Sequence, residues 1–450
     1  MTLSNFFSKN LFHPLWDLKD HSVRLQTLKA LEGTQWMGRA ELMRVQFARA
    51  QEIIRYAYEN CAYYRASFDS AGVRPEDIRT GADIRRIPIL TKKEIRENAG
   101  GLVSGRYRKE DLVSAKTGGS TGKSLTLYFD ADCQEMRNAA AIRSDRWANW
   151  ELGDKKAALW GNPPLADTLK KVLRNALVDR VIYLDTLNLN RKSMSDFVDI
   201  YKRYKPTVIF GHSHSLYIFA GFLRDNRISD LKPKGIISTS MMLMPHEREV
   251  IEEVFGCAVT NRYGCEEVGL ISCECERHNG MHLNIDHLLV EFIKDDGAPA
   301  GEQEEGAIVV TDLINRGMPL IRYRIEDVGV YTERSCECGR GLPLMERVAG
   351  RVADFLLKKD GSMVAGVSLV ERTLTAIKGL EQMQIVQDTV ESITIKLVRG
   401  ADFSEESALE LSDEFRRVFG DIEIRIEYVD SIPQERSGKY RFSICRVPGV

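Results

Sequence analysis

The strongest constraint on the fold of this chain is a change in its hydrophobic pattern. Between about residues 110 and 330, short apolar runs alternate with segments whose apolar residues recur at helical spacing. This alternation predicts an α/β domain in which buried strands are layered with helices. The predicted strands lie at residues 157–160, 208–210, 235–237, 287–293 and 308–311, and the predicted helices at 169–177, 216–223 and 247–255.

The pattern is different beyond residue 350. Residues 393–397 and 422–428 alternate apolar and polar side chains, as strands covered on one face do, and residues 405–419 between them read as a helix. We therefore predict a small α+β domain over residues 350–450, following a large domain over residues 1–349. A chain of 450 residues exceeds the usual size of a single hydrophobic core.

Two features of the N-terminal part also predict local structure. Residues 41–61 place apolar side chains near helical spacing, which predicts an amphipathic helix. Residues 87–90 read as an extended segment that leads into another helix. Thr91 is its predicted N-cap, with Glu94 completing a capping box.

The composition limits the classes of partner. A formal net charge of −2 offers no overall attraction to nucleic acid or to an anionic membrane. No apolar run approaches the roughly 18–20 residues that cross a bilayer, so we expect no membrane insertion. The first residues lack the pattern of a signal peptide, and we expect a cytoplasmic protein. The oligomeric state stays open, a homodimer included.

A glycine-rich run follows an extended segment at 111–115 and precedes another at 125–129. Its glycines allow backbone N–H groups to converge on an anion, while hydroxyl groups and one lysine add donors and charge. A Walker loop needs four residues between its first glycine and Gly-Lys-Ser, and this run has three, so it is not a Walker loop. A plain hairpin turn is the alternative. The run consists of Thr117, Gly118, Gly119, Ser120, Thr121, Gly122 and Lys123.

Four further motifs follow in a fixed order, at residues 261–267, 319–327, 347–354 and 433–441. Each is weak alone, but few classes of protein present all of them after such a loop. In these motifs the chain resembles the AMP-forming adenylating superfamily, which includes the acyl-CoA synthetases. It is especially similar to the phenylacetate–CoA ligase-like family and its capsular polysaccharide biosynthesis branch. The resemblance covers nearly the whole chain.

The resemblance implies a large domain that binds ATP and a small carboxylic acid, and a mobile C-terminal lid domain. It implies that residues 117–123 hold the β- and γ-phosphates of ATP. Tyr263 would stack on adenine, with Asn261 and Gly264 beside it, and Asp327 would bind the ribose hydroxyls. The alternative for Asp327 is an ion pair with Arg322 or Arg324 inside the core.

The resemblance also implies catalytic roles for two charged residues. Glu267 would ligate Mg²⁺, for which a carboxylate oxygen is a suitable hard ligand. Lys439 would bridge the substrate carboxylate and the α-phosphate, as a flexible point charge can. Arg351, in the turn between the domains, would contact phosphate or ribose. The bland alternatives are a solvated carboxylate and a solvated lysine.

The acyl acceptor is less well defined than the activation step. Family members that rotate the C-terminal domain often carry Asp or Lys where this chain has Ala353. The broad family implies transfer of the acyl group to CoA, and the polysaccharide branch favours an amine, which would give an amide ligase. An inactive nucleotide-binding scaffold is an alternative from another class, disfavoured by the joint presence of Lys439, Glu267 and Asp327.

The acid pocket is expected near Trp160, His212 and Ser240, where the family builds its acyl and adenine pockets. His212 would contact the carboxylate or line the pocket, and a core histidine with satisfied hydrogen bonds is an equal alternative. Nothing in these residues separates aryl, aliphatic and amino acids.

The nine cysteines include two close pairs, Cys273 with Cys275 and Cys336 with Cys338, and such pairs suggest a metal site. Cys275 and His278 form a C-x-x-H element, and Cys336 and Cys338 form a C-x-C turn. Four nitrogen and sulfur ligands from two short loops fit a closed structural zinc site. The alternative is a group of reduced thiols near the surface. Spare candidates for the ligand set are Cys273, His282 and His287.

Overall fold

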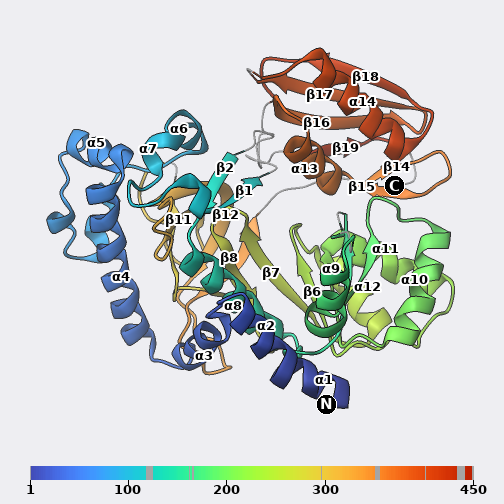
Figure 1. Cartoon of the computed structure of the whole chain (residues 1–450), viewed down its shortest axis with the longest axis horizontal. Coiled ribbons are helices and arrows are strands. Elements are labelled where there is room, and N and C mark those ends of the chain that lie inside the picture. The colour runs from blue at the N-terminus through green and yellow to red at the C-terminus, as the bar shows by residue number, and fades with distance from the viewer. Residues whose placement is uncertain are drawn as a thin grey trace.

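The computed structural model describes residues 2–117, 125–161, 163–164, 167–294, 296–349, 355–400, 402–432 and 441–447. The fold is mixed α/β, with a large N-terminal part built on several sheets and a smaller C-terminal domain (Figure 1). This confirms the predicted fold class. None of the helices in the described ranges is long and apolar enough to cross a membrane.

The described helices begin with a nearly continuous N-terminal rod and end in the C-terminal domain. They are α1 Leu3–Phe7, η1 Ser8–Phe12, α2 His13–Lys19, α3 Arg24–Thr34, α4 Arg39–Asn60, α5 Ala62–Ser70, η2 Pro75–Asp77, η3 Gly81–Arg86, α6 Lys92–Glu97, α7 Ala99–Leu102, η4 Lys109–Asp111, α8 Ala131–Trp147, α9 Leu169–Arg174, η5 Asn175–Asp179, α10 Arg191–Tyr204, α11 Ser213–Asp225, α12 Pro245–Phe255, α13 Gly366–Ala376 and α14 Glu405–Phe419. The π-helical turns η1 and η5 continue α1 and α9.

The described strands form one large sheet and three small ones. They are β1 Val113–Thr117, β2 Leu125–Phe129, β3 Lys156–Trp160, β4 Val181–Asp185, β5 Val208–His212, β6 Gly235–Thr239, β7 Val259–Cys265, β8 Gly269–Glu274, β9 Met281–Leu283, β10 Leu288–Ile293, β11 Glu305–Asp312, β12 Tyr323–Thr332, β13 Leu344–Ala349, β14 Phe355–Leu357, β15 Met363–Ala365, β16 Leu380–Thr389, β17 Ser392–Arg399, β18 Glu423–Tyr428 and β19 Ser443–Cys445.

The large sheet has eleven strands in the order β10-β11-β12-β13-β9-β8-β7-β6-β5-β3-β4. From β4 to β7 along this order, neighbouring strands are parallel. From β7 to β10, neighbouring strands are antiparallel. The strands of the parallel half are connected through α9 with η5, α10, α11 and α12, because parallel strands need a long crossover connection. The strands and helices predicted between residues 157 and 311 are confirmed, with ends shifted by one to three residues.

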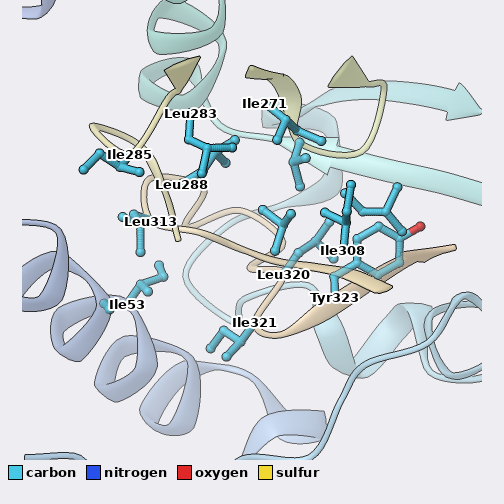
Figure 2. Packing of buried hydrophobic residues seen from close by; sticks show 14 of the residues in the cluster. Ile53, Ile271, Leu283, Ile285, Leu288, Ile308, Leu313, Leu320, Ile321 and Tyr323 are labelled. Atoms are coloured by element: carbon cyan, nitrogen blue, oxygen red, sulfur yellow. The ribbon is translucent and has the colours of Figure 1, made fainter. Parts of the chain in front are cut away.

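Helix α4 lies on the antiparallel half and explains the apolar spacing of residues 41–61. Its buried side chains, among them Ile53, pack against Leu288, Leu320 and other residues of β10 to β12 (Figure 2). The opposite face of α4 is exposed and polar, with Arg44, Glu52 and Arg55 on it, and Val45 of the predicted apolar set is also exposed. The predicted amphipathic helix is therefore confirmed.

The segment before α6 is attached to β12. Thr91 caps α6: its Oγ1 accepts from the Glu94 N–H at 3.3 Å, and the Glu94 carboxylate accepts from the Thr91 N–H at 2.7 Å, so the predicted capping box is confirmed. Leu90 forms a parallel bridge with Tyr323. The Arg322 guanidinium donates to the carbonyl groups of Arg85 and Ile87, at 3.0 and 2.6 Å. The chain entering α6 therefore has a fixed place beside the start of β12.

The C-terminal domain is a four-stranded sheet, β18-β17-β16-β19, with α13 and α14 (Figure 1). The predicted helix at 405–419 and the two predicted strands are confirmed. Its core is continuous from Leu356 to Phe442, and the large domain adds Leu187 and partly buried Met241 to it. Lys358 also reaches Asn188, at 3.5 Å. The small domain therefore rests on the loops that follow β4 and β6.

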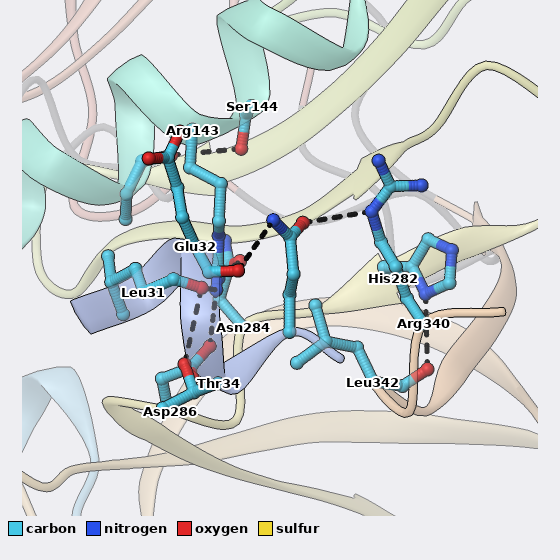
Figure 3. Close-up of polar contacts among 12 residues, drawn as sticks. Leu31, Glu32, Thr34, Arg143, Ser144, His282, Asn284, Asp286, Arg340 and Leu342 are labelled. Carbon is cyan, nitrogen blue, oxygen red and sulfur yellow. Dashed lines mark hydrogen bonds and ion pairs between the residues drawn. The ribbon is translucent and has the colours of Figure 1, made fainter. Parts of the chain in front are cut away.

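A buried arginine joins three elements of the large domain. Arg143 of α8 is fully buried and donates to Asp286 at 2.8 Å, to the side-chain oxygen of Asn284 at 2.6 Å and to the Leu31 carbonyl of α3 at 3.1 Å (Figure 3). Thr34 donates to the same aspartate. A buried charge is tolerated only when it is paired and hydrogen-bonded, so this contact fixes the positions of α3, α8 and the β9–β10 connection.

We predict that Arg143→Met lowers the free energy of unfolding by about 3–5 kcal/mol, because it leaves the Asp286 carboxylate buried without its cation. The urea midpoint measures the change. Arg146→Met on the same helix is the matched control. Arg146 pairs with Glu32 and Glu151 at the surface, so its loss should cost at most about 1 kcal/mol. Equal losses in the two variants would contradict the prediction.

Candidate functional site

The predicted acid-pocket residues lie at one edge of the parallel sheet. Trp160 ends β3, His212 ends β5 and Ser240 directly follows β6. The rings of Trp160 and His212 are 4.3 Å apart, and Ser240 has a left-handed backbone with φ of 65°. In open α/β sheets, ligands bind outside the carboxyl ends of the strands. The three residues therefore gather where a ligand site is expected.

His212 is a buried, neutral histidine. Burial lowers its pKa from 6.5 to about 4, and within the described part of the chain its Nδ1 has no hydrogen-bond partner. Below it, the hydroxyl groups of Ser213 and Ser238 lie 2.6 Å apart. A neutral ring at this edge can exchange a hydrogen bond with a ligand without adding charge.

The next strand, β7, brings two predicted nucleotide residues to β12. The Tyr263 hydroxyl donates to Asp327 Oδ2 at 2.9 Å. Gly264 permits the bulge between β7 and β8, since a Cβ there would lie 2.4 Å from the Gly269 carbonyl oxygen. The backbone N–H of Asn261 donates to Glu274 at 2.8 Å. Tyr263 of the predicted adenine site and Asp327 of the predicted ribose site are thus in direct contact.

Glu267 lies in the turn after β7 and is buried between two residues that sequence analysis did not identify. The Tyr323 hydroxyl donates to its Oε1 at 3.1 Å, and Lys92 Nζ lies 3.9 Å from the same oxygen. All three side chains are buried. Glu267 is therefore not the solvated carboxylate of the bland alternative. In the sequence, Lys92 directly follows the predicted N-cap Thr91. That pattern predicts the start of a helix and carries no sign that Lys92 faces a carboxylate.

Arg322, one of the two alternative ion-pair partners considered for Asp327, pairs with another carboxylate. Arg322 pairs with Glu291, at 2.9 and 3.1 Å, and also donates to the segment before α6. The Arg322 guanidinium therefore forms its ion pair with Glu291 of β10. The backbone N–H of Arg324 donates to the Leu90 carbonyl at 2.9 Å.

Several predicted residues lie outside the described ranges. These are Gly118, Gly119, Ser120, Thr121, Gly122 and Lys123 of the glycine-rich run, Arg351, Ala353 and the proposed catalytic Lys439. The strands around the run are described: β1 and β2 pair antiparallel, and Thr117 is opposite Leu125 at the end of the ladder.

Four side chains that can ligate a metal converge between the end of β8, strand β9 and the loop that joins β12 to β13. Cys275 follows β8, His282 lies in β9, and Cys336 and Cys338 lie between β12 and β13. Their ligand atoms all lie within 4.8 Å of one another. Cys275 Sγ is 3.6 Å from Cys336 Sγ, and Cys338 Sγ is 3.3 Å from His282 Nε2. These separations are close to the roughly 3.8 Å between two sulfur atoms bound tetrahedrally to one ion.

The groups around these four residues favour metal binding. His282 Nδ1 faces the Leu342 carbonyl at 3.1 Å, which leaves Nε2 directed at the cysteines (Figure 3). Backbone N–H groups of Arg277 and Arg340 donate to Cys275 and Cys338, each at 3.4 Å. Burial alone would raise the pKa of Cys338, but the Arg340 N–H and guanidinium outweigh it and hold that pKa below its ordinary value. Burial raises the pKa of the Cys275 and Cys336 thiols, so among these three cysteines it is Cys338 whose surroundings favour the thiolate.

The predicted ligand set needs one correction. His278 was expected to be the fourth ligand, but its Nδ1 lies 3.3 Å from Glu274, and His282 takes the place in the cluster. The C-x-x-H spacing was misleading because β8 and β9 pair antiparallel with Cys273 opposite His282, and Cys275 follows two residues later, directly after β8, so His282 comes close to Cys275 across the strands. Cys273 is buried with its thiol toward the Glu274 carbonyl, and His287 is buried and is not among the four clustered residues.

Known proteins with similar sequences belong to the families that the sequence motifs resemble. Residues 356–446 match the CapK C-terminal domain family. The chain is 24% identical to Protein CapK of Staphylococcus aureus over 424 residues, which cover 90% of each chain. It is 27% identical to a phenylacetate-coenzyme A ligase of Thermus thermophilus over 392 residues, covering 84% of this chain and 86% of that one.

A solved structure of 2-hydroxyisobutyryl-CoA ligase, in complex with its acyl-adenylate and CoA, superposes with a TM-score of 0.62. The match covers 92% of both chains at 19% identity, and it establishes a common fold. The chain therefore has the fold of the adenylate-forming ligases. Within that class it is a homologue of CapK and of the phenylacetate-coenzyme A ligases, which confirms the resemblance found in the sequence.

The buried histidines predict acid sensitivity. Burial lowers the pKa of His287 to about 3 and that of His212 to about 4, against 6.5 for an ordinary histidine. Below about pH 6.5 these histidines bind protons in the unfolded chain but remain neutral in the folded chain. The free energy of unfolding therefore falls as the pH drops from about 6.5 to about 4. Each histidine contributes a slope of about 1.4 kcal/mol per pH unit.

We predict that His287→Gln removes about one such proton from the pH dependence of the free energy of unfolding, measured by urea titration between about pH 7 and 5. The matched control is His21→Gln on the exposed surface. If the two variants keep the same slope as the unchanged chain, the histidine explanation is wrong.

Proposed function

We propose that this protein is an AMP-forming ligase that activates a small carboxylic acid with ATP and then transfers the acyl group to CoA. The observation that carries the proposal is the convergence of Tyr263 and Glu267, from β7 and its turn, on Asp327 and Tyr323 of β12. It brings the predicted adenine, ribose and magnesium residues together beside the strand ends that hold Trp160 and His212.

In the first step, a carboxylate oxygen of the acid attacks the α-phosphorus of ATP and pyrophosphate leaves. Asp327 binds the ribose, and Tyr263 covers the adenine. Glu267 is the proposed Mg²⁺ ligand, and its buried carboxylate suits a hard cation. When bound, the ion would neutralise charge on the phosphates. In the second step the CoA thiolate attacks the acyl carbonyl, and AMP leaves.

The remaining parts of the proposal involve residues beyond the described ranges. Residues 117–123 would hold the β- and γ-phosphates, Arg351 would contact the nucleotide, and Lys439 would bridge the carboxylate and the α-phosphate. We assign residues 1–349 to ATP and acid binding and residues 350–450 to a lid that delivers Lys439. Nine reduced cysteines agree with a cytoplasmic location.

We predict that Lys439→Ala lowers acid-dependent exchange of pyrophosphate into ATP by at least about a hundredfold, because one charge on the developing transition state is lost. ATP binding, measured by calorimetry, should be largely retained. Lys378→Ala, an exposed lysine in the same domain, is the matched control. Full exchange in Lys439→Ala would remove the assigned role.

The acceptor is tested separately with the unchanged protein. A panel of carboxylic acids that supports exchange is incubated with ATP and either CoA or an amine, and the products are identified by mass. An acyl-CoA product supports the proposal. An amide formed in place of the thioester would keep the adenylation step and replace the second one.

We further propose that the Cys275, His282, Cys336 and Cys338 cluster holds a structural zinc ion. Three sulfur ligands and one nitrogen ligand complete a tetrahedral zinc site and leave no open position for catalysis. The cluster joins the segments after β8, in β9 and between β12 and β13. Arg340, beside it, donates to Gln35 at 2.9 Å and so reaches the turn between α3 and α4.

We predict about one zinc ion per chain by elemental analysis, a content near zero in His282→Ala, and full content in His278→Ala. His282→Ala should also lower the unfolding midpoint, because metal binding contributes to folding stability. The two histidines lie four residues apart, so they form a matched pair. Zinc that is absent from active protein, or lost equally in both variants, would contradict the proposal.

A further inference from the structure

A histidine and a glutamate form a pair where the adjacent helices α11 and α12 begin (Figure 1). His214 is the second residue of α11, and its Nδ1 lies 2.5 Å from Oε1 of Glu247, the third residue of α12. The second carboxylate oxygen of Glu247 accepts from the Met244 N–H at 3.1 Å, within a capping box. The carboxylate is therefore held in place, and it fixes the orientation of the imidazole ring.

This contact determines which nitrogen of His214 is basic. A carboxylate only accepts hydrogen bonds, so Nδ1 of the neutral ring carries the hydrogen and Nε2 is the nitrogen that can take a proton. Enzymes position a general base with a carboxylate in this way. The side chain of His214 is 31% exposed and that of Glu247 only 4%, so the ring, and not the carboxylate, is accessible.

The pair lies at the same sheet edge as the proposed acid pocket. His212 ends β5, two residues before His214. Between them, the Ser213 hydroxyl donates to the Met241 carbonyl at 2.9 Å. Met241 directly follows Ser240 of the proposed pocket and packs against the core of the C-terminal domain. His214 is therefore beside the pocket, close to where the two domains meet.

Only one of the two steps of the proposed reaction needs a base. In the first step the acid attacks as its carboxylate, which has no proton to lose at neutral pH. In the second step the attacking thiol must lose its proton. An ordinary thiol has a pKa of about 8.5 and is only a few per cent ionised at pH 7. A histidine oriented at the pocket therefore has its chemical use in acyl transfer.

We propose that His214 is the general base of acyl transfer and that Glu247 is its positioning residue; this inference rests on the proposed function. His214 Nε2 takes the proton of the CoA thiol while the sulfur forms its bond with the acyl carbon. The bond between that carbon and the phosphate oxygen of AMP breaks, and AMP leaves with its electron pair. Glu247 stabilises the resulting imidazolium ion through Nδ1.

The test measures the two steps separately. Protein loaded with acyl-adenylate, from ATP and an acid that supports pyrophosphate exchange, is mixed with CoA, and acyl-CoA is quantified over a single turnover. At pH 7, His214→Gln should lower the transfer rate by about a hundredfold or more and change pyrophosphate exchange by less than about twofold. An unchanged urea midpoint shows that the variant folds.

The pH dependence distinguishes a base from a structural contact. Between pH 7 and about 8.5 the thiolate fraction of CoA in solution rises by roughly tenfold, and a thiolate needs no base, so the defect of His214→Gln should shrink by about that factor. Glu247→Gln should show the same pattern, because a glutamine amide donates to Nδ1 and moves the ring hydrogen to Nε2. Among the described residues, the titratable groups beside the His214 ring are Glu247 and Tyr217, and Tyr217 also contacts His246.

His246→Gln is the matched control. His246 is an exposed histidine on α12 whose ring centre lies 5.6 Å from that of Tyr217, as that of His214 does. It should transfer like the unchanged protein. Transfer that is unaffected in His214→Gln, or a defect equal in both steps and constant with pH, would overturn the base and leave the adenylation reaction standing. An unchanged protein that exchanges pyrophosphate with no acid would overturn the proposed function, and the base with it.

Discussion

The buried ion pair between Arg143 and Asp286 is the contact on which the organisation of the large domain depends. It joins α3, α8 and the connection between β9 and β10, which are far apart in the sequence. Few other arrangements of the Arg143 guanidinium are stable, because a buried cation must be paired with an anion and hydrogen-bonded. Asn284 and Leu31 supply two of those acceptors (Figure 3). The β9 strand that leads to this pair also carries His282.

The cluster of Cys275, His282, Cys336 and Cys338 and the ion pair of Arg143 with Asp286 both involve the segment from β9 to β10. His282 precedes Asn284 by two residues, and its ring contacts Trp147 of α8 at 5.6 Å between ring centres. With the proposed ion bound, the cluster would fix the loop between β12 and β13, and β12 carries Asp327 and Tyr323 to the candidate nucleotide site. An ion that holds these loops would therefore support the site from a distance, without taking part in chemistry.

The sequence predicted the regular parts of the fold and the residue types of the site, and its misses have physical causes. Strand β17 and helix α14 could be predicted from the period of their apolar residues, and strands β5 and β6 from short apolar runs that alternate with helical segments. Helix α8 does not, because its buried face includes Arg143, Ser144 and Asp145, so no apolar stripe marks it. His282 was ranked below His278 because spacing along the chain does not report cross-strand proximity.

The pairing of Lys92 with Glu267 shows why an N-terminal segment is needed at a site built on the sheet. A carboxylate as buried as that of Glu267 has lost its contacts with water, and a cation or hydrogen-bond donors beside it must compensate for that loss. Lys92 and Tyr323 meet that need from one side, at Oε1. Lys92 reaches this place because Leu90 bridges Tyr323 and Arg322 binds the carbonyl groups before it. The capping box that starts α6 then sets the direction of the lysine, so a local helix signal also determines the charge around the proposed magnesium ligand.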